Sequence, residues 1–205
     1  MMLASPVREL TAFFDRLAPH WNAMQSADRS ARLARLLAPH ASLFEGAHRV
    51  LDIGTGTGAF LPHLARLAPG AHVIAVDLSL VMLGMARAAN PGAAVWLQAD
   101  AHRLPLRAGC ADLVTCHNTF AHFEERRVAL REIHRLLAPG GTLFILHDIP
   151  REQVNAIHSS ADSPRIRRHL LPPVDEAAAH IAAAGFDMQA ANDADHYLII
   201  ARRSA

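Results

Sequence analysis

The sequence contains no lysine, so all 20 of its strongly basic side chains are arginine, and 19 acidic residues bring the net charge to +1. Aromatic residues make up only 5% of the 205 residues. Proteins that bind a phosphate backbone need a basic stripe, and proteins that bind single strands need aromatic stacking platforms. The composition therefore argues against a nucleic-acid-binding protein.

Cysteine is also scarce, because only Cys110 and Cys116 are present and they do not form a C-x-x-C pair. The sequence shows no disulfide framework, no signal-peptide pattern and no apolar run long enough to cross a membrane. We therefore expect a soluble, cytoplasmic protein. The apolar fraction of 51% and the charged fraction of 19% are typical of a globular domain with its own core.

The most informative stretch runs from residue 50 to residue 67. Residues 50–53 are apolar and predict a short buried strand, a glycine-rich turn follows at 54–58, and residues 59–67 are compatible with a helix. Strand, glycine turn and helix open a nucleotide-binding βαβ unit. The spacing here is G-x-G-x-G, not the dinucleotide pattern G-x-G-x-x-G, and Asp52 precedes the first glycine. An acid at this place suits a cationic group, such as an amine or a sulfonium, better than a phosphate.

Two more acids follow predicted strands. Residues 72–77 predict a strand that ends in Asp77, and residues 94–98 predict a strand that is followed by Asp100. The carboxyl ends of strands line the ligand crevice in open α/β sheets. Asp77 is placed to accept hydrogen bonds from the ribose hydroxyls of a nucleoside, and Asp100 to accept one from an exocyclic amine such as that of adenine.

The remaining pattern alternates strands and helices, which predicts an α/β protein with a mostly parallel sheet. Ser79 is expected to cap the helix that follows Asp77. Further strands are expected at 111–116 and 142–146, a closing strand pair at 186–192 and 197–201, and helices at 124–137, 151–158 and 174–184.

Two amphipathic helices are expected before the first strand, one ending near Pro19 and one at 28–37. We divide the chain into an N-terminal helical region, 1–46, and a main domain, 47–205. The helical region is predicted either to pack against one face of the sheet or to form a lid over the ligand cleft. In the second case Phe14, His20 and Trp21 would face the substrate.

Several stretches, taken in order, resemble the class I methyltransferases that use S-adenosylmethionine: 50–58, 75–79, 99–101, 111–116, 135–141 and 183–186. The resemblance covers residues 45–205. It implies a Rossmann-like, mostly parallel seven-stranded sheet with helices on both faces and a closing antiparallel strand. Residues 14–22 are similar to the start of the quinone-biosynthesis C-methyltransferases, which suggests a quinone-like acceptor, although the segment after the fifth strand is shorter and more polar here.

The resemblance implies S-adenosylmethionine as the cofactor and gives each matching position a role. Asp52 would face the methionine amine, Asp77 would hold the ribose hydroxyls, and Asp100 would accept from the adenine amine. Cys116 and His117 would border the sulfonium. The implied cofactor-binding set is Asp52, Gly54, Thr55, Gly56, Gly58, Asp77, Leu78, Asp100, Ala101, Cys116 and His117.

Methyl transfer is an in-line displacement, in which the enzyme positions two partners and, where needed, removes a proton from the acceptor. Proton acceptors are expected at the ends of the fourth and fifth strands, where the sequence offers His117, His122, His147 and Asp148. The chain has 14 histidines, so each single candidate carries limited weight. His158, on the predicted helix 151–158, is a candidate substrate contact.

The segment after the fifth strand leaves a second interpretation open. His147, Asp148 and His158 could form a divalent-metal site, because imidazole and carboxylate are suitable ligands; the alternative is a polar substrate loop. We therefore keep three functions: a methyltransferase with a small-molecule acceptor, a metal-assisted enzyme on the same fold, and a non-catalytic cofactor-binding partner subunit. The sequence His117-Asn118-Thr119-Phe120 lacks the Asn/Asp-Pro-Pro-aromatic signature of nucleic-acid amino methyltransferases. A homodimer remains an open alternative.

Overall fold

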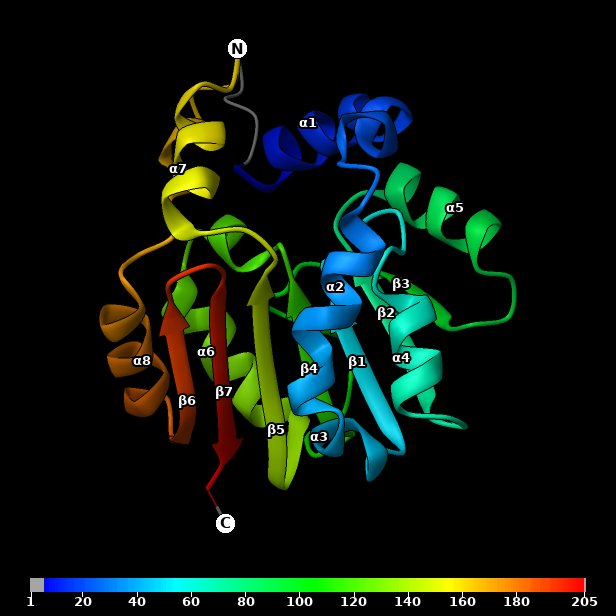
Figure 1. Ribbon diagram of the computed structural model, residues 1–205, viewed down its shortest axis with the longest axis vertical. Helices are drawn as coiled ribbons and strands as arrows, with labels where there is room; N and C mark the ends of the chain where they lie inside the picture. Colours follow the sequence, from blue (N-terminus) through cyan, green and yellow to red (C-terminus); the bar gives the residue numbers. More distant parts are fainter. Residues whose placement is uncertain (1–5, 205) are drawn as a thin grey trace.

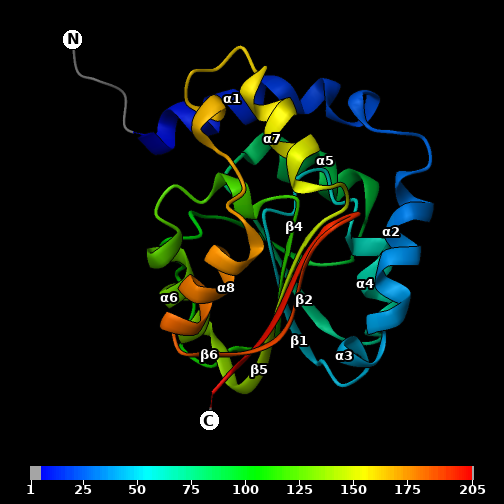
Figure 2. The same ribbon diagram turned by 60° about the vertical axis from the view of Figure 1, so that its left-hand side comes forward.

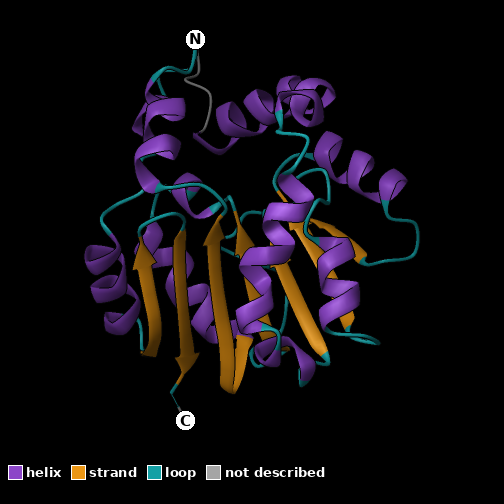
Figure 3. Cartoon of the chain, viewed as in Figure 1, coloured by secondary structure: helices purple, strands orange, loops and turns teal. Residues whose placement is uncertain are grey.

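The computed structural model describes residues 6–204, which form a central sheet covered by helices on both faces (Figures 1 and 3). The sheet has seven strands in the order β3-β2-β1-β4-β5-β7-β6. β7 runs antiparallel to both β5 and β6, and the other pairs are parallel. This confirms the predicted fold class. The strands are β1 Arg49–Ile53, β2 His72–Asp77, β3 Val95–Gln98, β4 Ala111–His117, β5 Leu137–His147, β6 Phe186–Asp193 and β7 Tyr197–Arg203.

The helices divide into two covering layers and a group at the carboxyl ends of the strands. Figure 2 shows α2, α3 and α4 on one side of the sheet and α6 and α8 on the other. The α-helices are α1 Pro6–Trp21, α2 Arg29–Leu37, α3 Ser42–Glu45, α4 Leu61–Leu67, α5 Leu80–Ala89, α6 Arg126–Leu136, α7 Arg151–Ser159 and α8 Val174–Ala183. Four 3₁₀ turns complete the list: η1 Asn22–Met24, η2 Ala38–His40, η3 Phe120–His122 and η4 Ile166–Arg168.

Apolar residues at helical spacing explain how the layers pack. In α6, Ala129, Ile133 and Leu136 are fully buried against one face of the sheet. In α2, Leu33 and Leu37 lie one turn apart and join the cluster on the other face. The second expected helix is therefore part of the core that covers the sheet, which is the packing role predicted for the N-terminal region.

Several element boundaries differ from the predictions, among them those of α1, α6 and β5. α1 continues through Pro19 to Trp21, because a proline in the last turn removes only one backbone hydrogen bond. α6 begins at Arg126, two residues later than expected. β5 begins at Leu137, five residues before the strand expected at 142–146; Leu137 pairs with Ala111, and the register shifts before Thr142.

α1 lies across the carboxyl ends of the strands, together with α7 (Figure 1). Ser79 caps α5 as predicted, accepting a hydrogen bond from the Met82 amide at 3.1 Å, and its hydroxyl donates to Asp15 of α1 at 2.5 Å. Just after α1, Asn22 accepts a hydrogen bond from Thr57 at 2.7 Å. These contacts fix α1 above the glycine turn. Within residues 6–204, no helix is both long and apolar enough to cross a membrane.

Candidate active site

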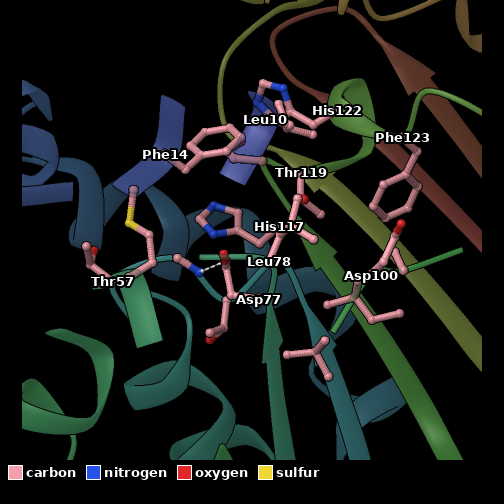
Figure 4. A pocket seen from close by; sticks show the side chains of 18 of the residues that line it. Leu10, Phe14, Thr57, Asp77, Leu78, Asp100, His117, Thr119, His122 and Phe123 are labelled. Carbon is pink, nitrogen blue, oxygen red and sulfur yellow. Dashed lines mark hydrogen bonds between the residues drawn. The ribbon is translucent and has the colours of Figure 1, made fainter. Parts of the chain in front are cut away.

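A cavity of about 880 Å³, its open mouth included, lies between the carboxyl ends of β1 to β4 and helix α1 (Figure 4). The lining residues are Leu10, Phe14, Trp21, Arg29, Ile53, Gly54, Thr55, Gly56, Thr57, Ala59, Val76, Asp77, Leu78, Met82, Ala99, Asp100, Ala101, His102, His117, Asn118, Thr119, His122 and Phe123.

The glycine turn forms one wall of the cavity. The amides of Gly54 and Thr55 both donate to the Val76 carbonyl of the neighbouring strand, at 2.8 and 3.0 Å. Gly54 has φ +71°, and a Cβ there would lie 2.1 Å from the Thr119 hydroxyl oxygen. Gly56 also has a positive φ, but no atom lies within 4 Å of the place where its Cβ would be. The turn is therefore closed behind Gly54 and open above Gly56, where a ligand can lie against the backbone.

The two acids predicted from the strand ends both line the cavity. Asp77 accepts hydrogen bonds from the Gly56 amide at 2.8 Å, drawn in Figure 4, and from the Ser79 amide at 2.9 Å. Burial raises the pKa of Asp77 to about 6, although these hydrogen bonds oppose the shift. Asp100 is bonded to the His102 ring at 2.5 Å, which lowers the pKa of Asp100 and raises that of His102.

Residues 51–145 match the family model described as a methyltransferase domain. This match and the relatives described next support a class I S-adenosylmethionine-dependent methyltransferase domain in this part of the chain. It is 37% identical over 152 residues to a ubiquinone/menaquinone biosynthesis C-methyltransferase of Syntrophotalea carbinolica, covering 69% of this chain and 62% of that one. It is 38% identical over 143 residues to a demethylmenaquinone methyltransferase of Thermus thermophilus, covering 67% of this chain and 64% of that one. The chain thus spans less than two thirds of the length of these relatives.

The fold agrees with this family. A crystal structure of an S-adenosylmethionine-dependent methyltransferase from Aquifex aeolicus superimposes with a TM-score of 0.69 at 18% identity, covering 99% of this chain and 100% of that one. At this identity the likeness concerns the fold alone. It extends the match beyond residues 51–145, because nearly the whole chain is superimposed.

The fold brings most of the sequence-predicted site residues into the cavity wall. Eight of the cofactor candidates and three of the acceptor-side candidates line it: Gly54, Thr55, Gly56, Asp77, Leu78, Asp100, Ala101, His117, Phe14, Trp21 and His122. Seven candidates lie outside the lining: Asp52, Gly58, Cys116, His20, His147, Asp148 and His158. Among these, His20 is exposed, Cys116 is fully buried, and a Cβ on Gly58 would meet the Asn90 side chain at 2.6 Å.

Asp52 lies beneath the glycine turn with only 1% of its surface exposed. One carboxylate oxygen accepts from the Thr115 hydroxyl at 2.7 Å, and the other is buried with no hydrogen-bond partner. Burial raises the pKa of Asp52 above its usual range. An unpartnered buried carboxylate oxygen is costly without a cation or a donor. Together with the open space above Gly56, it fits a cationic nucleoside such as S-adenosylmethionine.

A buried charged network around Asp148 lies behind the part of the cavity wall that Arg29, His117 and Asn118 form. This carboxylate accepts from Asn118 at 2.5 Å and from Arg32 at 3.2 Å, and it lies 3.7 Å from Nε of Arg29. His117 Nε2 is 3.9 Å away and has no hydrogen-bond partner. Burial lowers the pKa of His117 to about 3, against the opposing effect of Asp148, so this imidazole is neutral.

The structure does not bring the three candidate metal ligands together. His147 packs edge-on against Tyr197 with ring centroids 5.9 Å apart, and Asp148 is held by the arginines. His158 is bonded to the His169 carbonyl. Across the described residues 6–204, no three His, Cys, Asp or Glu side chains form a group that could hold a metal. The predicted metal trio is therefore corrected: these side chains belong to separate contacts.

Sequence reasoning missed several residues of the wall, including Leu10, Arg29, Thr57, Thr119 and Phe123. Thr119 and Phe123 follow β4 directly, so the rule that placed His117 at a strand end could have been extended to them. Arg29 begins α2 and reaches the cavity only through the tertiary fold, and no local pattern marks it.

Proposed function

We propose that the chain is a methyltransferase that uses S-adenosylmethionine to methylate a small molecule. The observation that carries the proposal is the cavity wall itself, in which Asp77 lies between the open turn at Gly56 and Asp100, following the sheet order β1-β2-β3. Asp77 would hold the ribose hydroxyls and Asp100 would accept from the adenine amine, while Leu78 and Ala101 lie beside them in the same wall. When bound, the cofactor supplies an electrophilic methyl group on a sulfonium.

The methionine part of the cofactor would lie toward Asp52 and the network around Asp148. Asp52 is buried beneath the turn and outside the cavity lining, so its unpartnered oxygen would reach the amine through a water molecule. The side chain of Arg29 lines the cavity, and its Nε lies 3.7 Å from Asp148 without a hydrogen-bond partner. A guanidinium is the side chain best matched to a carboxylate. Arg29 is thus our proposed partner for the cofactor's carboxylate.

The acceptor would enter below α1, where the wall is apolar and aromatic. Leu10, Phe14 and Trp21 line this part, and His122 lies beside Phe14 (Figure 4). Flat aromatic side chains favour a planar acceptor. A quinone-like molecule is our proposed class, in keeping with the names of the two relatives from Syntrophotalea carbinolica and Thermus thermophilus.

The N-terminal region 1–46 would serve two roles in this proposal. Its first helix, α1, would act as the lid, since Leu10, Phe14 and Trp21 contact the cavity. Its second helix, α2, would support the lid from the core. A homodimer is a further proposal, supported by the position of β3 at the edge of the sheet with Val95 67% exposed; light scattering would test it.

Calorimetric titration with S-adenosylmethionine and its demethylated product tests the cofactor, and transfer of a labelled methyl group to a panel of quinols, phenols and carboxylic acids tests the reaction. We expect binding of both compounds and a labelled product from a quinol or phenol. Absence of binding would overturn the proposal. Binding without transfer to any acceptor would favour the non-catalytic partner subunit instead.

A further inference from the structure

Three histidines from separate segments meet beside the cavity. His122 comes from η3, His158 from α7, and His169 follows η4. The His122 ring centroid lies 4.8 Å from that of His158 and 5.4 Å from that of His169. On its other side the His122 ring meets Phe14 of α1 edge-on at 5.0 Å. Of these three histidines, His122 lines the cavity.

The hydrogen bonds of this cluster determine where its protons lie. Nε2 of His169 is 3.2 Å from a carboxylate oxygen of Glu124, and an ionised carboxylate can only accept, so this nitrogen carries a hydrogen. In a neutral imidazole the other nitrogen is then an acceptor. Nδ1 of His169 lies 3.1 Å from Nδ1 of His122, which must therefore donate.

These hydrogen bonds leave Nε2 of His122 without a hydrogen. Because Nδ1 holds the hydrogen, Nε2 carries the lone pair, and no group within residues 6–204 is hydrogen-bonded to it. Glu124, acting through His169, thus fixes the tautomer in which His122 presents an unprotonated nitrogen to the cavity. A carboxylate that orients a histidine in this way is a known device for presenting an unprotonated nitrogen to a substrate.

We propose that His122, His169 and Glu124 form a proton-acceptor relay for the methyl acceptor, with Nε2 of His122 as the base. The acceptor's O–H bond breaks as the Nε2–H bond of His122 forms, and the electron pair stays on the acceptor oxygen. That oxygen would form the new O–C bond to the methyl group as the methyl C–S bond of the cofactor breaks, with its electron pair left on the sulfur. The Nδ1 hydrogen of His122 passes to Nδ1 of His169. The positive charge then resides on His169 beside Glu124. The relay rests on the proposed function, because it needs an acceptor with a dissociable proton.

The surroundings favour this direction of transfer. Burial and the neighbouring histidines His158, His169 and His147 lower the pKa of His122, so its ring is neutral before the reaction. Burial also lowers the pKa of His169, but Glu124 opposes that shift. Glu124 itself has a lowered pKa despite some burial, because Arg165 and His169 bond to it.

The three residues have different tasks. His122 is the catalytic residue, because it alone of the three lines the cavity. His169 and Glu124 are positioning residues that act through it. The side chain of Glu124 is 29% exposed and is also bonded to Arg165, which links it to Glu9 of α1. The relay therefore runs from the cavity wall to the protein surface.

Nitrogen-15 NMR of histidine-labelled protein tests the relay without any acceptor. In the wild type at pH 8 we expect the His122 signal of the tautomer with hydrogen on Nδ1. Glu124→Ala should move His122 toward the tautomer with hydrogen on Nε2, and Glu124→Asp should restore the wild-type signal. The matched control is Glu125→Ala, which removes the adjacent exposed carboxylate and should change nothing.

The relay is overturned if wild-type His122 carries its hydrogen on Nε2, or if Glu124→Ala leaves its tautomer unchanged. The first of these outcomes is measured on the wild type, so the proposal can still be tested if Glu124→Ala does not fold. Titration of the same samples with the demethylated cofactor product separates the two proposals. Lack of binding by the wild type would overturn the proposed function. The tautomer of His122 tests only the relay.

Discussion

The two sides of the cavity are built in different ways. One side, which we call the floor, consists of residues that directly follow β1, β2 and β3, among them Gly56, Asp77 and Asp100. The other side, which we call the roof, joins α1, η3 and the segment after α7, among them Phe14 and His122. A floor residue is placed by the strand before it. A roof residue is placed by contacts between segments that lie far apart in the sequence. Phe14 and His122, for example, are more than a hundred residues apart.

This difference suggests a division of labour. The floor offers acids and open backbone, which suit the nucleoside part of the proposed cofactor. The roof offers aromatic rings and histidines to an acceptor. Variants of the floor should therefore change cofactor affinity, whereas variants of the roof should change turnover.

The largest effect is expected for His122→Gln in the roof. Loss of a positioned general base typically reduces the rate by about 10²–10⁴-fold, so kcat should fall by that factor while calorimetric affinity for the demethylated cofactor stays the same. His20→Gln is the matched control, because His20 is an exposed histidine outside the cavity wall. An unchanged kcat, or a loss confined to cofactor affinity, would break the proposed division.

The next effect is expected for Asp77→Ala in the floor. This change removes two hydrogen-bond acceptors for the ribose, and each bond to a charged group contributes about 1.5–3 kcal/mol. Cofactor affinity should weaken by about 10²-fold, the lower part of that range. Asp175→Ala, an exposed carboxylate in the first turn of α8, should leave the affinity unchanged. If Asp77→Ala binds the cofactor as tightly as the wild type, Asp77 has no role in the floor.

The floor could be predicted from the sequence because its signals are local. Each glycine or acid directly follows an apolar strand, and in a parallel sheet all such ends meet at one edge. The fold followed from the same regularity, since the strands and helices alternate along the chain. The exception is Asp52, whose position was expected at the cofactor but whose side chain lies beneath the turn, bonded to Thr115.

The roof could not be predicted to the same extent because it depends on tertiary contacts. The grouping of His147 and Asp148 with His158 rested on ligand chemistry and on their nearness in the sequence after the fifth strand. The structure instead directs Asp148 toward Arg32 and places His158 against His122. His169 lies in a segment with no periodic pattern, so nothing in the sequence marks its hydrogen bond to His122. With 14 histidines in the chain, only the three-dimensional arrangement selects among them.

A smaller effect concerns the pH dependence of the floor. The pKa of Asp77 is raised by burial to about 6, so this side chain is mainly protonated at pH 5 in the free protein. Ribose hydroxyls bind best to the ionised form, and calorimetric affinity should therefore be about tenfold weaker at pH 5 than at pH 8. Asp77→Asn should flatten the dependence between these values. A wild-type affinity that does not change with pH would show that Asp77 is ionised throughout.

The raised pKa of Asp77 also makes the stability of the folded protein depend on pH. Because the folded-state pKa lies above the unfolded value of 3.8, the folded protein binds more protons between pH 4 and pH 6. Asp77 should then lower the free energy of unfolding as the pH rises through this window, by about 3 kcal/mol in the cofactor-free protein. Urea unfolding of the wild type and of Asp77→Asn at pH 4 and pH 6 measures this change in the free energy of unfolding. If Asp77 were stabilised in its ionised form, the free energy of unfolding of the wild type would instead rise with pH.

The smallest effect is expected for Arg165→Ala, which removes the ion pairs that connect the roof to α1. Arg165 is bonded to Glu9 of α1 at 2.9 Å and to Glu124, and these side chains are partly exposed. Surface pairs contribute about 0–1 kcal/mol, so the free energy of unfolding should fall by no more than that. Amide hydrogen exchange in α1 should nevertheless become faster, because one of its links to the rest of the roof is lost. The control is Arg8→Ala, because Arg8 is an exposed arginine on α1 itself. Equal exchange in both variants would mean that α1 is held by the apolar and Asp15 contacts alone, and the roof would then open independently of the carboxylate that orients the histidines.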